Sequence, residues 1–150
     1  MMADDIGEIA AWMVQVPLWQ RYRLTTEIIT NQFQTAISER ALLYVIEVEG
    51  QTVVSGFAWY LAQGAFGRSA YLKQIGVHPD STGLGIGRQL LAHVEEACKQ
   101  FSDQLFLLVS DFNKDAQKFY ERQDYQHCGT IPAYVLPDVA ELIYHKRLLD

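Results

Sequence analysis

Apolar residues recur at helical spacing in the first part of the chain. One set lies before Pro17 and a second set follows Thr25 and Thr26, either of which can cap a helix. The first helix is expected to begin with a capping box formed by Asp5 and Glu8. The expected inner faces are Ile6, Ile9, Ala10 and Met13 for the first helix and Ile28, Ile29, Phe33, Ala36 and Ile37 for the second.

The pattern then changes to segments rich in β-branched and aromatic residues. Residues 42–48 and 52–61 are such segments, and the short polar stretch 49–51 between them predicts an antiparallel hairpin. After a loop over 63–67, residues 69–77 predict a third strand.

Helical and strand patterns alternate in the second half. A long helix is expected from Gly87, because its apolar positions keep a 3.6-residue period, and the apolar run 105–109 predicts a buried central strand. A further helix is expected to begin at Asn113, and two last strands over 125–129 and 141–148. This order predicts an α/β (α+β) fold.

Composition narrows the class of protein. With 150 residues, of which 49% are hydrophobic, the chain is expected to form one domain over 1–150. Its net charge of −6 argues against a nucleic-acid partner and mildly favours a cationic substrate, although solubility alone explains an acidic surface. Cys98 and Cys128 have no ligand-like spacing, so no metal site is expected. Without a long apolar run or a basic leader, the sequence predicts a cytoplasmic protein with no membrane partner.

The candidate chemistry lies between the strand ending at Val77 and the helix beginning near Gly87. This turn reads Thr82, Gly83, Leu84, Gly85, Ile86, Gly87 and Arg88. A helix N-terminus offers unpaired N–H groups, and glycines let a phosphate approach the backbone. The dinucleotide fingerprint fails because Arg88 stands where glycine is needed, and the P-loop spacing fails because no Lys-Ser or Lys-Thr follows Gly87. A tight connection without a ligand is the remaining alternative.

The turn resembles the motif of the GNAT superfamily of N-acetyltransferases. Gly85 and Gly87 occupy its two small positions, and residues 75–79, 86–91 and 113–121 resemble the flanking strand end and helices. Thr82 stands where the family usually has Arg or Gln, and Asp124 where it generally has Gly. The resemblance covers about Leu42 to Leu148.

The resemblance implies a fold and a cosubstrate. The fold is a mixed, mostly antiparallel sheet flanked by about four helices, with a V-shaped splay between the strand ending at Val77 and the strand starting at Leu105. The family's N-terminal strand is either absent here or the chain begins after it. Acetyl-CoA would place its pyrophosphate on residues 82–88 and its pantetheine arm on the main chain of Ile75 and Val77. Asn113 would cap its helix and contact acetyl-CoA.

The resemblance also implies an acid for the reaction. Tyr120 matches the tyrosine acid of the family, and a phenol with a pKa of about 10 can protonate the leaving thiolate. The alternative role for Tyr120 is packing beside Phe119. No motif fixes a general base, so Asp111 and a water relay both remain open, and Tyr134 is a candidate for the acceptor pocket. The four histidines, His78, His93, His127 and His145, are interpreted as turn, surface or core residues.

Three functions remain in competition. The first is transfer of an acetyl group to a primary amine of a small molecule or a peptide, with a homodimer as one expected assembly. The second is a non-catalytic module that senses acyl-CoA, and the third is a nucleotide-binding protein of another phosphate-loop class. An aromatic wall for the amine could comprise Trp19, Tyr22, Trp59 and Tyr134, although core packing is expected for at least half of these residues.

Overall fold

A computed structural model describes residues 1–149 and resolves them into two compact units. Unit 1 comprises Met1–Tyr60 and Gln74–Val94, and unit 2 comprises Leu61–Lys73 and the chain from Glu95 onward. Two strands and one helix begin in one unit and end in the other. A single domain over 1–150 stays a prediction.

Helices come first along the chain, and strands alternate with helices afterwards. In order, the elements are α1 (Asp5–Met13), α2 (Pro17–Arg21), α3 (Thr26–Ser38), β1 (Leu42–Ile46), β2 (Gly56–Ala65), β3 (Ser69–Val77), the short 3-10 helix η1 (Pro79–Ser81), α4 (Ile86–Cys98), β4 (Gln104–Ser110), α5 (Lys114–Arg122), β5 (Gln126–Ile131) and β6 (Glu141–Arg147). The six strands follow the order β1-β2-β3-β4-β6-β5. The predicted mixed, mostly antiparallel sheet is confirmed. The described chain has five α-helices rather than four, because Pro17 begins the short helix α2.

Two predictions about the ends of the first helices have opposite outcomes. The Thr25 side chain accepts a hydrogen bond from the Ile28 N–H at 3.2 Å and caps α3, as predicted. The capping box of α1 is wrong, because the N-cap is Asp4 and the Glu8 carboxylate instead accepts the Val54 N–H at 3.1 Å. That bond ties α1 to the segment that precedes β2.

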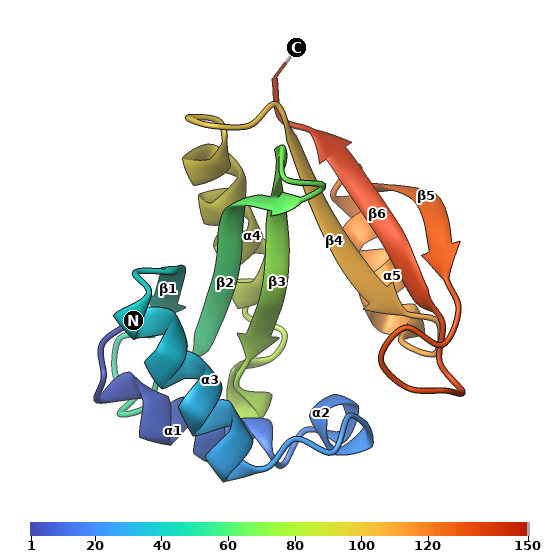
Figure 1. Cartoon of the computed structure of the whole chain (residues 1–150). Helices are drawn as coiled ribbons and strands as arrows, with labels where there is room; N and C mark the ends of the chain where they lie inside the picture. Colours follow the sequence, from blue (N-terminus) through green and yellow to red (C-terminus); the bar gives the residue numbers. More distant parts are fainter. Residues whose placement is uncertain (150) are drawn as a thin grey trace. The chain divides into compact units, whose positions relative to one another are not determined.

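Helices α1 and α3 lie together in unit 1 (Figure 1). The core of this unit is rich in aromatic residues. The Phe57 ring lies 5.8 Å from Trp12 and 5.3 Å from Phe33, measured between ring centroids. A Cβ on Gly76 would lie 2.6 Å from the Phe57 and Trp19 rings, so glycine permits this packing. Ile28 is 40% exposed, and its predicted inward position on α3 is wrong.

The connection between β1 and β2 is longer than the predicted three-residue turn. The two strands do pair in antiparallel fashion, but the last pair is Ile46 with Gly56, so residues 47–55 form the loop. The Val54 side chain is buried at 1% exposure although it lies in this loop. Val54 therefore belongs to the core without being part of a strand.

In unit 2, β4, β6 and β5 lie side by side (Figure 1). β4 pairs antiparallel with β6 from Gln104–Arg147 to Ser110–Glu141. β3 pairs parallel with β4 over three positions only, from Ala70–Leu105 to Leu72–Leu107, and both strands continue beyond them. Such short pairing is the pattern expected of the predicted splay.

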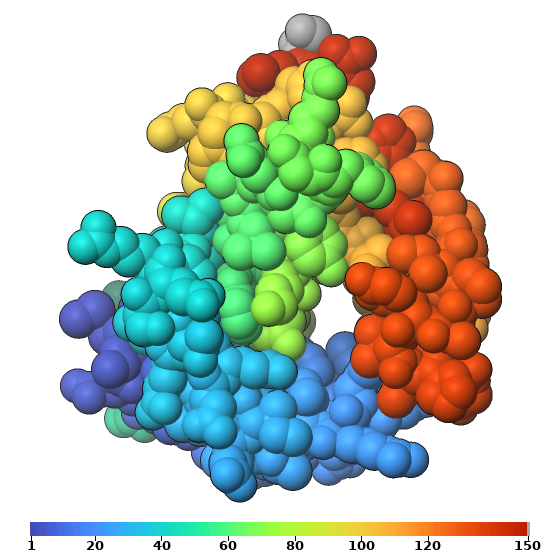
Figure 2. All heavy atoms as spheres, in the orientation of Figure 1, coloured from blue at the N-terminus to red at the C-terminus, as the bar shows by residue number. Residues whose placement is uncertain are grey.

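A two-residue turn joins β2 to β3. Phe66 and Gly67 have φ of +57° and +64°, and the Arg68 N–H donates to the Ala65 carbonyl at 3.1 Å, as in a type I′ hairpin. β2 therefore extends through most of the loop predicted over 63–67. The turn projects in green at the top of Figure 2, where Phe66 is 78% exposed.

Candidate functional site

The glycine turn of unit 1 has an open and strained backbone. Gly83 and Gly85 have φ of +79° and +76°, and no atom lies within 4 Å of a Cβ built on either residue. Thr82 to Gly85 are exposed, and α4 begins directly afterwards at Ile86. The left-handed backbone requires glycine, and the open space leaves the main chain accessible to a ligand. Gly87 lies in the first turn of α4, and Arg88 beside it is exposed.

Buried contacts fix the beginning of α4 beneath this turn. Ile86 and Leu90 are 3% and 0% exposed. A Cβ on Gly56 of β2 would lie 2.9 Å from Ile86 and 3.0 Å from Leu90, so glycine at this position allows α4 to lie close to the strand. The first N–H groups of a helix have no partner within the helix and carry partial positive charge. The turn therefore offers a fixed set of donors suited to an anion.

Ile75 and Val77 occupy the last part of β3 in unit 1. Both side chains are half-buried, and Gly76 between them faces the aromatic core formed by Trp12, Trp19 and Phe57. Because residues alternate along a strand, Ile75 and Val77 point to the opposite side of the sheet. Their predicted role in binding the pantetheine arm stays a prediction.

Tyr120 of unit 2 lies on α5 and is 6% exposed. Its ring contacts Phe119 and Tyr125, with centroid distances of 5.1 and 5.6 Å. Burial, followed by the repulsion between its phenolate form and that of Tyr71, raises the pKa of Tyr120 above that of an ordinary tyrosine. The hydroxyl therefore keeps its proton at neutral pH.

Two neighbouring tyrosines provide a comparison with Tyr120. The Tyr125 hydroxyl donates to Glu95 at 3.0 Å, and the Tyr144 hydroxyl donates to Glu121 at 3.0 Å. Within residues 1–149, the Tyr120 hydroxyl makes no hydrogen bond. The Tyr120 hydroxyl oxygen is not among the buried polar atoms that lack a partner, so it keeps some exposure and can donate to a ligand.

Tyr71 is a neighbour of Tyr120 that sequence reasoning missed. Burial, with smaller contributions from Tyr134 and Glu141, raises the pKa of Tyr71 to about 12. Tyr71 lies on β3 and Tyr120 on α5, so no local spacing connects them. Only the folded unit brings the two hydroxyls close enough for their ionised forms to repel each other.

Three further polar residues that the sequence singled out have structural roles. The Asn113 side chain caps α5 by accepting the Ala116 N–H at 3.2 Å, as predicted. The Asp111 carboxylate accepts the Ala140 N–H at 3.1 Å, which ties the end of β4 to the beginning of β6. Asp124 adopts the left-handed conformation, with φ of +67°. It therefore keeps the turn after α5 that glycine would usually make.

The four histidines have local partners. His78 Nδ1 accepts the Asp80 N–H at 3.0 Å, which agrees with a turn role. The His93 ring stacks on Tyr44 at 3.6 Å between centroids. His127 Nε2 lies 2.7 Å from the Gly129 carbonyl oxygen, and His145 Nδ1 lies 3.1 Å from Gln104 Oε1. No group of three or more His, Cys, Asp or Glu residues suited to a metal occurs within residues 1–149.

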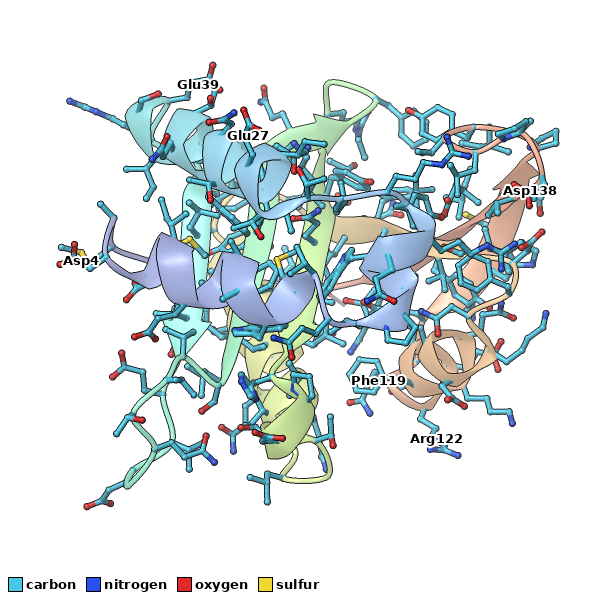
Figure 3. All side chains as sticks on the ribbon, turned by 90° about the horizontal axis from the view of Figure 1, so that it is seen from below. Asp4, Glu27, Glu39, Phe119, Arg122 and Asp138 are labelled. Atoms are coloured by element: carbon cyan, nitrogen blue, oxygen red, sulfur yellow. The ribbon has the colours of Figure 1, made fainter. Side chains whose placement is uncertain are left out.

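The proposed aromatic wall is divided between core and surface. Trp19 and Trp59 are 7% and 6% exposed and belong to the core of unit 1. Tyr134 of unit 2 is 60% exposed and remains available to a ligand. In Figure 3, Phe119 and Arg122 project from α5, and Asp138 lies on the loop between β5 and β6. No helix within residues 1–149 has the length and apolar character needed to cross a bilayer.

Comparison with known proteins identifies the family. The family model described as Acetyltransferase (GNAT) family matches residues 6–125. Thialysine N-epsilon-acetyltransferase from Bos taurus is 36% identical over 77 residues, which are 50% of this chain and 45% of the relative. The chain thus matches less than half the length of that relative.

Solved structures share the fold at lower sequence identity. Ribosomal-protein-alanine N-acetyltransferase from Brucella melitensis has a TM-score of 0.76 and 22% identity, with 98% of this chain and 96% of the other covered. Aminoglycoside 6′-N-acetyltransferase complexed with coenzyme A has a TM-score of 0.77 and 12% identity, with 97% and 91% covered. Because the family model spans most of the sequence, this chain belongs to the acetyltransferase (GNAT) family of acyltransferases.

Proposed function

We propose that this chain transfers the acetyl group of acetyl-CoA to a primary amine of a small molecule or a peptide. The observation that carries the proposal is the glycine turn, where Gly83 and Gly85 hold an open, left-handed backbone directly before α4. That cradle would be filled by side chains at either position, and its donors suit a pyrophosphate. A structural relative complexed with coenzyme A supports the same cosubstrate.

Residues of unit 1 would hold the cosubstrate. Backbone N–H groups from Gly83 to Arg88 would bind the pyrophosphate, with Thr82 contributing at the beginning of the turn. Main-chain groups of Ile75 and Val77 would bind the pantetheine arm and polarise the thioester carbonyl. Asn113 of unit 2 would contact acetyl-CoA in addition to capping α5.

Tyr120 would supply the proton that the reaction requires. Acetyl-CoA brings the acetyl group and a thiolate leaving group. As the amine nitrogen bonds to the acetyl carbon and the carbon–sulfur bond breaks, the Tyr120 hydroxyl gives its proton to the sulfur. The proton lost by the amine nitrogen then restores the phenol, through water or through Asp111. The unpaired hydroxyl supports this role, because the acid must be free to donate its proton to the sulfur.

The class of acceptor is supported by charge and by the relatives. The chain carries a net charge of −6, which favours approach of a cationic amine. The names of the relatives include acceptors that are a thialysine, a ribosomal-protein alanine and an aminoglycoside. A cytoplasmic location and a homodimer stay predictions.

A panel of amines tests the proposal directly. Purified protein is mixed with acetyl-CoA and with lysine analogues, aminoglycosides or peptides with a free N-terminus, and release of free thiol is followed. Turnover with at least one class is expected. Binding of CoA without turnover on any amine would instead support the acyl-CoA sensor. Tight binding of ATP or NAD without CoA binding would support a nucleotide-binding protein of another phosphate-loop class.

A further inference from the structure

A single side chain connects the loop before β2 to the start of the glycine turn in unit 1. Gln51 Oε1 accepts hydrogen bonds from the Ser55 hydroxyl at 2.8 Å and from the Ser81 hydroxyl at 2.9 Å. Both serines are 0% exposed. Ser81 ends η1 and directly precedes Thr82. The first residue of the turn is therefore one peptide bond away from this junction.

The same loop holds the other end of η1 through the backbone. The His78 N–H donates to the Ser55 carbonyl at 2.8 Å, and the Ser81 N–H donates to the His78 carbonyl at 2.8 Å. Ser55 is itself fixed to β1, because its N–H donates to the Ile46 carbonyl at 2.8 Å. η1 is thus fastened at both of its ends to a segment anchored on the sheet.

The position of Gln51 in the loop allows its side chain to hold Ser81. Its N–H donates to the Val48 carbonyl at 2.9 Å, and Gly50 turns the chain with φ of +85°. The amide oxygen has two lone pairs, and both receive a buried hydroxyl. A buried hydroxyl that loses its acceptor is costly, so removal of this oxygen should displace Ser81.

We infer that Gln51 is a positioning residue that fixes Ser81, and through it the glycine turn, in the conformation that binds CoA. The choice of CoA as the ligand rests on the proposed function. The positioning role itself rests on the hydrogen bonds that Gln51 makes in unit 1. Gln51 acts through Ser81. Its effect should therefore be seen in CoA affinity and in the glycine amides, with the helices and strands intact.

The test uses the full chain with Gln51→Met, which keeps the side-chain length but removes the acceptor. The dissociation constant for CoA, measured by calorimetry, should rise about tenfold. Ser81→Ala removes the donor of the same hydrogen bond and should also raise the dissociation constant for CoA. The double variant should be no worse than Gln51→Met, because both changes remove one link. Gln100→Met, at an exposed residue in the turn after α4, is the matched control and should leave the affinity unchanged.

Amide resonances separate this inference from the proposed function. In protein without ligand, Gln51→Met should shift the amide signals of Gly83 and Gly85, while that of Gly7 in α1 stays in place. Unmoved signals of Gly83 and Gly85, or additive effects in the double variant, would overturn the positioning role. If the unchanged chain bound no CoA at millimolar concentration, the proposed function would fail, and the glycine signals would still decide the role of Gln51.

Discussion

The glycine turn and the Tyr120 hydroxyl, the two features that the proposed function uses, are built in different ways. In unit 1 the glycine turn presents main-chain groups, and the space around Gly83 and Gly85 is open. In unit 2 the candidate acid is one hydroxyl, that of Tyr120, whereas the hydroxyls of Tyr125 and Tyr144 are paired with carboxylates. A backbone site depends on conformation and tolerates changes of side chain. A site that depends on one side chain loses its function when the single reactive oxygen atom is removed.

Removal of the Tyr120 hydroxyl should have the largest effect. Tyr120→Phe is expected to lower kcat by about a hundredfold or more, because general acid catalysis typically contributes this much. The dissociation constant for acetyl-CoA should change little, since the hydroxyl acts as the bond to sulfur breaks. Steady-state kinetics with an amine identified by the panel provide the measurement.

Tyr125→Phe and Tyr144→Phe are the matched controls for that experiment. Each removes a hydroxyl that donates to a glutamate, so each should lower the free energy of unfolding by about 1 kcal/mol. Neither should change kcat comparably. Equal losses of kcat in all three variants would make Tyr120 a packing residue.

A change of backbone conformation in the glycine turn should have the next largest effect. Gly85→Ala places a Cβ on a residue with φ of +76°, which costs about 1 to 2 kcal/mol and should weaken CoA binding about tenfold. Gly7→Ala is the matched control, because Gly7 lies in α1 with open space around it and no left-handed φ. Calorimetric titration of CoA compares the two variants, and equal affinities would contradict a backbone site at Gly85.

The turn after α5 gives a smaller prediction that concerns stability. Asp124 has φ of +67°, so Asp124→Gly should raise the free energy of unfolding by about 0.5 to 1 kcal/mol. Asp115→Gly, inside α5, is the control and should be destabilising by about 1 kcal/mol. Urea denaturation measures both, and a lower stability for Asp124→Gly would mean that the Asp side chain is needed in the turn.

The smallest effect is expected at Thr82. Its hydroxyl donates to the Pro79 carbonyl at 3.1 Å, within the 3-10 turn itself. If main-chain groups make the site, Thr82→Ala should change the dissociation constant for CoA by less than about threefold. A larger loss would show that this side chain takes a direct part in binding.

The sequence was most informative where the governing interactions are local. The strand 69–77 and the cap of α3 at Thr25 were predicted as observed, because strand composition and the cap lie within a few residues. The length of the loop 47–55 was not predicted, because the apolar Val54 suggested a strand residue. Its apolar character instead serves contacts with residues far away in the sequence. It is buried in the core of unit 1, and its N–H pairs with Glu8, 46 residues away.

The candidate site likewise contains features that local sequence predicts and features that only the folded structure reveals. The order of glycines and the helix that follows them point to an anion site from sequence alone, because backbone conformation there is set by residues within the turn. Gln51 and Tyr71 could not be found in this way. Gln51 lies 30 residues from Ser81, and Tyr71 is on a different element from Tyr120.

The sequence by itself determined the family, the positions of most helices and strands and the turn that can receive a phosphate. These follow from periodicity, from glycine and from a motif carried by neighbouring residues. Tertiary structure decided that Tyr71 lies near Tyr120, which glutamates accept from Tyr125 and Tyr144, and which residue accepts the Ser81 hydroxyl. A hydrogen bond needs its two atoms within about 3 Å, and only the folded chain brings distant residues to that separation.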